Sequence, residues 1–231
     1  MTRIFRQFFE PETCTYTYLI GTKSKEALII DPVYEKFDLY TQIIKELDLA
    51  LCFVIDTHTH ADHITCAYKL HKNLGAQIIN GEQSLCENVH IKLKENESIK
   101  INNQTLKAIY TPGHTDDSYS YHFEKQIFTG DILLIRGTGR TDFQNGDSKK
   151  SYDSIFNKLL KLPDETLVYP AHDYNGRTVS TIYEEKFFNP RLQVNSIEDY
   201  CKIMDNLNLP YPKYIDQAVP ANLKAGKIEK N

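Results

Sequence analysis

A histidine-rich cluster runs from position 58 to position 63, in the order His58-x-His60-x-Asp62-His63. It follows an apolar run at 51–55 that predicts a buried strand, and it precedes a helical pattern. Three imidazoles and a carboxylate packed this closely would repel one another or pack poorly with nothing to coordinate. The cluster therefore predicts a divalent metal site, since both groups are ordinary metal ligands. A polar loop that is rich in histidine by chance is the competing interpretation.

Three later residues fit the same prediction, namely His114, Asp131 and His172. Each ends a short turn that contains glycine or proline and follows a predicted strand. Each is weak alone, because such turns commonly contain Gly, Pro and Asp. Together they place a ligand type at three strand ends, where sheet proteins often build their sites. This ligand set permits either one metal or two.

The remaining pattern predicts the elements that position these residues. Strands are predicted at 15–20, 26–30, 51–55, 77–79, 98–101, 106–110, 118–123, 126–128 and 166–169, and helices at 37–47, 64–74, 152–159, 180–188 and 197–207. Strand runs with intervening and terminal helices indicate an α/β class with stacked sheets. Because no Gly-, Ser- or Pro-rich linker precedes position 208, residues 1–231 are predicted to form a single domain, with 209–231 as an irregular C-terminal tail.

Composition narrows the classes of partner. The chain has 231 residues and a net charge of −4 with scattered Lys and Arg, so no nucleic-acid or anionic-membrane partner is expected. Its 5 cysteines are widely spaced without a C-x-x-C motif, which favours a reducing compartment over a disulfide framework. No apolar run approaches the roughly 20 residues that span a bilayer. We expect a bacterial cytoplasmic protein, or a mitochondrial matrix protein if a targeting segment is missing.

The motif order resembles the metallo-β-lactamase superfamily. The resemblance rests on His-x-His-x-Asp-His, Gly113-His114, Gly130-Asp131 and the late His172, and it covers about residues 14 to 175. It implies a metallo-β-lactamase fold, which is a four-layer αββα sandwich with the metal at one edge between two sheets.

Further segments resemble the persulfide dioxygenase family within that superfamily. They are Leu134-Ile-Arg-Gly-Thr-Gly-Arg-Thr-Asp-Phe-Gln, Tyr169-Pro-Ala-His-Asp-Tyr, Asn189-Pro-Arg-Leu, Leu209-Pro-Tyr-Pro and Ala218-Val-Pro-Ala-Asn-Leu. The resemblance implies one Fe(II) per chain and oxidation of glutathione persulfide by O2 and water to sulfite and glutathione. By position, it makes His58, His114 and Asp131 the iron ligands. Two histidines and one carboxylate leave coordination positions open, as non-haem Fe(II) oxygenases require.

The resemblance also implies roles for residues around the iron. One group would orient the ligands or, alternatively, hold a second metal: His60, Asp62, His63 and His172. Another group would bind the glutathione portion of the substrate: Arg140, Asp142, Tyr174 and Arg191. Arginine suits the carboxylates of the tripeptide, because its planar fork binds them bidentately. A local salt bridge between Arg140 and Asp142 is the alternative for that pair.

Two rival functions remain open. A glyoxalase II-type two-metal thioester hydrolase resembles the chain around the metal. Such enzymes typically have His-Glu-Tyr where this chain has His172-Asp173-Tyr174, and they carry a longer helical extension. A non-catalytic sulfur-binding or sensing module is the second rival, although such a module needs no open metal site. Relatives suggest a homodimer, and any rhodanese-type sulfurtransferase partner is expected to be a separate chain.

Overall fold

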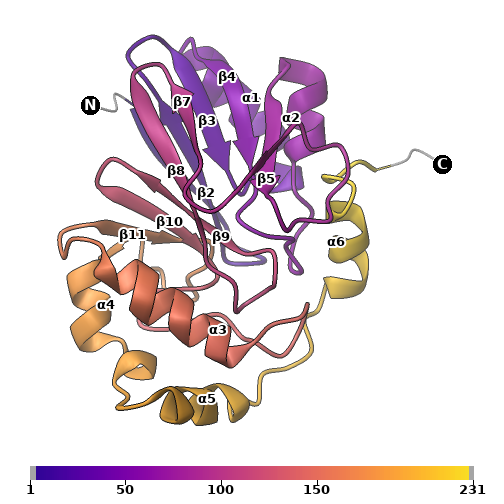
Figure 1. Ribbon diagram of the computed structural model, residues 1–231. Helices are drawn as coiled ribbons and strands as arrows, with labels where there is room; N and C mark the ends of the chain where they lie inside the picture. The colour runs from indigo at the N-terminus through magenta and orange to yellow at the C-terminus, as the bar shows by residue number, and fades with distance from the viewer. Residues whose placement is uncertain (1–3, 229–231) are drawn as a thin grey trace. The chain divides into compact units, whose positions relative to one another are not determined.

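The computed structural model describes residues 4–228, which fall into two compact units (Figure 1). The first unit contains the described residues 4–93, 99–105 and 212–228, and the second contains 94–98 and 106–211. Residues 1–3 and 229–231 of the predicted single domain 1–231 lie outside the described residues. The single-domain organisation stays a prediction, and each unit is described by itself.

The sheet of the first unit has six strands in the order β1-β2-β3-β4-β5-β6. Its strands are β1 (Ile4–Glu10), β2 (Thr15–Gly21), β3 (Glu26–Ile30), β4 (Ala50–Ile55), β5 (Gln77–Gly81) and β6 (Ile91–Leu93). β1, β2 and β3 pair antiparallel, whereas β3 to β6 run parallel. Buried parallel strands favour continuous apolar runs, which explains why β3 and β4 were predictable. β1 and β6 were not predicted.

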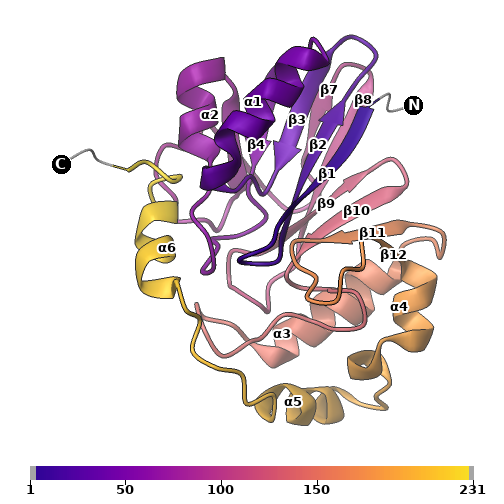
Figure 2. The same cartoon turned by 180° about the vertical axis from the view of Figure 1, so that it is seen from behind.

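Two helices of the first unit pack on this sheet: α1 (Phe37–Glu46) and α2 (Ala67–Leu74) (Figure 2). Tyr40 and Ile44 of α1 join Leu70 of α2 in one buried core with residues of β2 to β5. The helix α2 ends at Gly75, which has φ +76°, as the sequence predicted. Its start is later than the predicted 64, because the carbonyl oxygen of Ile64 accepts the backbone N–H of Tyr34 instead of a helical N–H.

The C-terminal tail corrects one prediction. The segment 209–231 was expected to be irregular, but it contains helix α6 (Ile215–Asn222), and its last residues, 229–231, lie outside the described residues. Pro220 lies inside this helix and removes one backbone donor. Ala218 of this helix is buried, and the buried amide of Asn222 is hydrogen-bonded to the first unit, so tertiary packing overrides the low helix propensity of the segment.

The sheet of the second unit is also mixed. The strands β7 (Ser98–Ile101), β8 (Gln104–Tyr110), β9 (Tyr119–Phe123), β10 (Gln126–Gly130), β11 (Leu167–Pro170) and β12 (Ser180–Thr181) lie in the order β12-β11-β10-β9-β8-β7. Residues 99–105, which include most of β7, are grouped with the first unit. β10 and β11 are parallel, and β8, β9 and β10 are antiparallel neighbours.

The helices of the second unit are α3 (Ser148–Asp153), α4 (Ile182–Phe188) and α5 (Ile197–Asp205). A π-helical turn at Ser154–Lys158 continues α3, and 3-10 turns lie at Leu159–Lys161 and Pro190–Leu192, with a further one at Tyr34–Lys36 in the first unit. Thr181 and Ser196 begin α4 and α5 by accepting backbone N–H groups with their hydroxyls. This capping starts α4 after the predicted position 180, where Ser180 pairs with Val168 instead.

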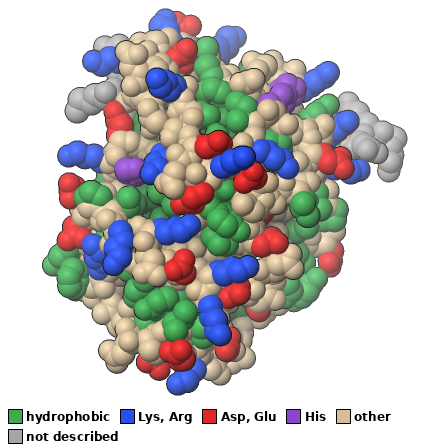
Figure 3. All heavy atoms as spheres, viewed as in Figure 1, with side chains coloured by type: hydrophobic (Ala, Val, Ile, Leu, Met, Phe, Trp, Pro, Cys, Tyr) green, Lys and Arg blue, Asp and Glu red, His purple; other side chains and the backbone are tan. Residues whose placement is uncertain are grey.

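The surface bears charges of both signs. On the face shown in Figure 3, lysine and arginine side chains are interspersed with aspartate and glutamate side chains. Within residues 4–228, every helix is too short or too polar to cross a membrane.

Candidate metal centre

The predicted histidine cluster lies on the loop that joins β4 to α2 in the first unit. Candidate ligand atoms of His60, Asp62 and His63 lie within 4.8 Å of one another. His58, His60 and His63 are buried, so the loop keeps its imidazoles away from solvent. The first unit therefore brings together three of the four residues of the cluster as one potential chelating group.

His58 is oriented by Thr57 and Asp31. The Thr57 hydroxyl donates to Oδ2 of Asp31 at 3.0 Å, and the Thr57 backbone N–H donates to Oδ1 at 2.7 Å. Nδ1 of His58 lies 2.9 Å from the same hydroxyl oxygen. Because that hydroxyl proton is given to Asp31, Nδ1 of His58 is the donor in this contact. Its Nε2 is therefore the basic nitrogen, the form in which histidine binds metals.

Asp31 is a buried carboxylate with several donors around it. It is 1% exposed, and Nε2 of His60 lies 3.0 Å from its Oδ1. Burial raises the pKa of Asp31, while its electrostatic interaction with the His58 imidazole and the hydrogen bonds from Thr57 lower it. Asp31 thus anchors the beginning of the histidine loop at two points.

The second unit brings together His114, Asp131 and His172. Each follows the end of a strand, namely β8, β10 and β11. Oδ2 of Asp131 lies 3.6 Å from Nε2 of His114 and 3.6 Å from Nε2 of His172. These separations exceed hydrogen-bond length, as expected for groups that face a shared ion.

The donor set of the second unit fits a metal ion. Nδ1 of His114 lies 2.8 Å from the backbone carbonyl oxygen of Arg140, which accepts its proton and leaves Nε2 basic. Oδ1 of Asp131 is buried and has no hydrogen-bond partner among residues 4–228. A buried carboxylate oxygen in this state is costly unless a cation satisfies it.

Two glycines allow the backbone to approach these ligands. A Cβ at Gly139 would lie 2.1 Å from the carbonyl oxygen of Asp131 and 2.9 Å from Nδ1 of His114. Gly113 has φ +146°, and a Cβ there would lie 2.4 Å from Cα of Ser151. Only glycine fits at both places. Gly113 and Gly139 are therefore steric requirements of the candidate site.

Arg140 and Asp142 form the salt bridge that the sequence left as an alternative. Nε and Nη2 of Arg140 donate to the two carboxylate oxygens of Asp142 at 2.6 and 2.7 Å. Its Nη1 donates to the carbonyl oxygen of Pro210 at 2.7 Å, and the guanidinium lies over the ring of Phe143. The hydrogen bonds from Arg140 lower the pKa of the Asp142 carboxyl. This guanidinium is thus held rigidly by the second unit.

The two other predicted substrate residues also lie in the second unit. Tyr174 is 68% exposed, and its ring is parallel to that of His172 at 5.9 Å. Arg191 donates from Nη1 to the backbone carbonyl and the hydroxyl of Thr138. Burial lowers the pKa of the Arg191 guanidinium.

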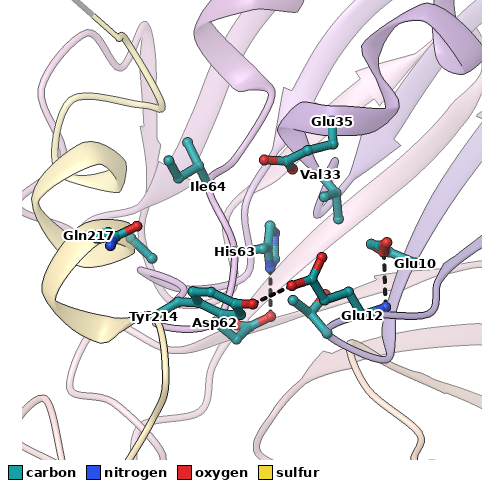
Figure 4. A pocket seen from close by; sticks show the side chains of 11 residues that line it. Glu10, Glu12, Val33, Glu35, Asp62, His63, Ile64, Tyr214 and Gln217 are labelled. Atoms are coloured by element: carbon teal, nitrogen blue, oxygen red, sulfur yellow. Dashed lines mark hydrogen bonds and ion pairs between the residues drawn. The ribbon is translucent and has the colours of Figure 1, made fainter.

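A pocket of about 190 Å³ opens beside the histidine loop in the first unit (Figure 4). Asp62 and His63 line it together with Glu12, Glu35 and Tyr214. The Tyr214 hydroxyl, just before α6, hydrogen-bonds to the Glu12 carboxylate. Carboxylate side chains therefore line the pocket beside the histidine loop.

Sequence reasoning missed three residues that hold the histidine loop: Asp31, Thr57 and Asn222. Asp31 was interpreted only as the stop of a strand. A buried acid directly after an apolar strand was the available signal, since such a group needs donors. Asn222 carries no local signal, because the partners of its side chain lie more than 150 positions away.

Comparison with known proteins identifies the superfamily to which the chain belongs. The model of the metallo-beta-lactamase superfamily matches residues 15–172, a span that contains every candidate metal ligand. The predicted metallo-β-lactamase fold is thereby confirmed, with two mixed sheets and flanking helices.

Comparison with individual relatives identifies the family within this superfamily. The chain is 48% identical to the mitochondrial persulfide dioxygenase ETHE1 of Mus musculus, over 96% of this chain and 89% of that protein. It matches the crystal structure of ETHE1 from Myxococcus xanthus with a TM-score of 0.95 and 49% identity, over 97% of this chain and 100% of that chain. A hydroxyacylglutathione hydrolase of Francisella tularensis subsp. holarctica is 30% identical over 81% of this chain and 75% of that protein. The chain belongs to the persulfide dioxygenase family, and the resemblance to the hydrolase is the more distant one.

Proposed function

We propose that the chain is an iron-dependent dioxygenase that converts glutathione persulfide, O2 and water into glutathione and sulfite. The main support for this proposal is the 48% identity to a persulfide dioxygenase over nearly the whole chain. This identity extends well beyond the metal motifs, which persulfide dioxygenases share with hydrolases of the superfamily.

His58, His114 and Asp131 are the iron ligands in this proposal. Two features of the separate units support the assignment. Nδ1 of each histidine is tied to an oxygen, which makes Nε2 the basic atom, and Oδ1 of Asp131 lacks a partner among the described residues. When bound, Fe(II) would supply adjacent coordination positions for sulfur and dioxygen. The protein residues would orient both imidazoles with Nε2 as the basic atom.

The proposal takes one metal per chain rather than two. Oδ2 of Asp62 accepts a hydrogen bond from the Thr15 hydroxyl at 3.1 Å and contacts Nδ1 of His63 at 2.8 Å. His60 contacts Asp31. Asp62 thus has two protein partners on one carboxylate oxygen, which supports an orienting role for it, and the similarity to persulfide dioxygenases supports the same role for His60 and His63. His172, whose Nε2 lies beside Asp131, has the same role in this proposal.

Glutathione is bound in this proposal by Arg140, Asp142, Tyr174 and Arg191 of the second unit. Asp142 holds the guanidinium of Arg140, whose side chain is 15% exposed, in a fixed plane. A fixed guanidinium binds a carboxylate at lower entropic cost than a mobile one. The exposed ring of Tyr174 next to His172 would line the binding site at the sulfur end of the substrate.

The predicted homodimer, the separate rhodanese-type sulfurtransferase and the reducing compartment belong to the same proposal. The five free cysteines support the compartment, since no disulfide joins them. Sedimentation of the purified protein and co-purification with a rhodanese-type protein would test the first two.

Oxygen uptake tests the function. Protein loaded anaerobically with Fe(II) is mixed with glutathione persulfide in an oxygen electrode, and sulfite is measured in the same sample. We expect uptake that requires both iron and persulfide, about one iron per chain, and no uptake by Asp131→Asn protein. Hydrolysis of lactoylglutathione by protein that holds two metals per chain would instead establish the hydrolase. A flat trace with iron-loaded protein would revive the non-catalytic sulfur-binding module.

A further inference from the structure

The tail helix α6 ends at a buried amide that contacts the histidine loop. Asn222 is 4% exposed, and all its partners considered below belong to the first unit. Its Nδ2 donates to the carbonyl oxygens of His60 and His63, both at 2.8 Å. Its Oδ1 accepts the backbone N–H of Thr65 at 2.9 Å. One side chain thus binds three backbone groups of a single loop.

This arrangement uses the particular chemistry of an amide. Both N–H donors of Asn222 serve loop carbonyls, and its oxygen serves a loop N–H. The loop bends between β4 and α2, so these groups have no partners in regular structure. A buried backbone group without a partner is costly, and the amide removes that cost at three points. Aspartate, although of the same shape, would turn an oxygen toward two carbonyl oxygens.

The tail backbone packs closely beside this contact. Gly226 has φ +73°, and a Cβ there would lie 1.9 Å from the carbonyl oxygen of Thr65. The Ala225 carbonyl accepts the N–H of Tyr68 at 2.9 Å, at the first turn of α2. The Leu223 carbonyl accepts the N–H of Glu87 at 2.7 Å. The tail is therefore fixed by its own backbone, so the amide of Asn222 is held where it meets the loop.

The loop is also held by Asp31, through Thr57 and His60. We infer that Asn222 is a positioning residue, which together with Asp31 fixes the histidine loop in the shape that presents His58 to a metal ion. The inference rests on the proposed iron site for its effect on metal binding. The hydrogen bonds between Asn222 and the loop lie entirely within the first unit, so this part of the inference does not depend on the iron site.

The test compares two isosteric changes of tail hydrogen bonds. Asn222→Asp removes the donors to the loop. Asn88→Asp is the matched control, because Nδ2 of the exposed Asn88 donates to the Lys224 carbonyl of the same tail but does not bind the loop. For each protein, we would measure amide hydrogen exchange of residues 60–66, the rate of Fe(II) release to a chelator, and the melting temperature. Asn222→Ser, which is smaller and uncharged, replaces Asn222→Asp if that variant does not fold.

We expect the Asn222 variant to exchange the amides of residues 60–66 at least about tenfold faster and to release Fe(II) at least about tenfold faster, because the loop opens more often once the donors to the His60 and His63 carbonyls are lost. The control should stay within about twofold of wild type in both. Unchanged loop exchange in the Asn222 variant, or equal effects in the control, would overturn the inference. If wild-type protein binds no iron, the proposed function fails, while the exchange result still decides whether Asn222 holds the loop.

Discussion

Nδ1 of His114 lies 2.8 Å from the backbone carbonyl oxygen of Arg140, a residue 26 positions further along the chain. This contact joins the Gly-His turn after β8 to the Gly-Thr-Gly-Arg segment after β10. It sets the proton on Nδ1 and leaves Nε2 as the basic atom toward Asp131. The segment that supplies a proposed substrate residue therefore also orients a proposed metal ligand.

Replacing His114 by alanine should abolish iron retention and oxygen uptake together. The remaining ligands His58 and Asp131 cannot by themselves form a facial triad. We expect the iron content after gel filtration, measured by atomic emission, to fall below about one tenth of the wild-type value. His122→Ala is the control, because His122 lies within β9 and is no candidate ligand. Iron retained by the His114 variant would refute its role as a ligand.

Thr57 should control iron affinity without touching the metal. Thr57→Val keeps the shape of the side chain but removes the hydroxyl between His58 and Asp31. We expect Fe(II) affinity about 10- to 100-fold lower, the usual cost of losing a group that orients a ligating histidine. Titration against a competing chelator measures it. Thr57→Ser should restore most of the affinity. Equal affinities in the Val variant and wild type would contradict the orientation of His58 by Thr57.

The features that could be predicted from the sequence are those that depend on residues close together in the chain. The strand predictions at 26–30 and 98–101 match β3 and β7, because β-rich runs bounded by turn residues are local signals. The end of α2 at Gly75 was equally local. The candidate ligands could be proposed because a dense cluster of histidines has few structural explanations, and their role stays a prediction.

What escaped prediction depends on long-range contacts. Helix α6 contains Pro220 and lacks a strong periodic pattern, so only its packing in the first unit reveals it. The support of the histidine loop by Asn222 joins residues more than 150 positions apart. Likewise, the sequence could propose that Arg140 pairs with Asp142, but only the structure shows both oxygens engaged.

Cys66 should resist alkylation in the folded protein. It is fully buried in the core of the first unit, and burial raises the pKa of its thiol to about 12. At pH 8 only roughly one molecule in 10⁴ would carry the reactive thiolate there. Mass spectrometry after iodoacetamide treatment should show Cys66 unmodified in native protein and modified in urea. Modification of native Cys66 at the rate of the half-buried Cys14 would contradict this burial.

The same thiol gives a pH dependence of stability. Its folded-state pKa is raised above the ordinary value of 9.0. Its contribution is therefore fully present below about pH 9 and is lost as the pH rises toward 12, because the unfolded thiol ionises first. Urea unfolding of wild type and Cys66→Ala protein should show a steeper decline in unfolding free energy above pH 9 for wild type. Parallel declines would contradict the raised pKa.

Arg140→Lys should weaken substrate binding more than it slows turnover. Lysine keeps the charge but loses the planar fork that Asp142 holds. We expect KM for glutathione persulfide to rise about tenfold, the cost of one charged hydrogen bond, with kcat within about threefold. Asp142→Asn, which loosens Arg140 without removing it, should raise KM by a smaller factor. An unchanged KM with a lowered melting temperature would reduce the pair to a structural salt bridge.

Gly139→Ala should disturb the metal ligands through crowding alone. The added Cβ would lie 2.1 Å from the Asp131 carbonyl and 2.9 Å from Nδ1 of His114, so one of these segments must move. We expect a stability loss of about 1–3 kcal/mol, typical of overpacking, together with iron affinity lowered at least about tenfold. Gly137→Ala is the matched control, because the nearest atom to its Cβ, in Leu134, would be 3.9 Å away. Urea unfolding and chelator competition measure the two effects, and equal behaviour of the two variants would show that the close approach at Gly139 is not needed for the site.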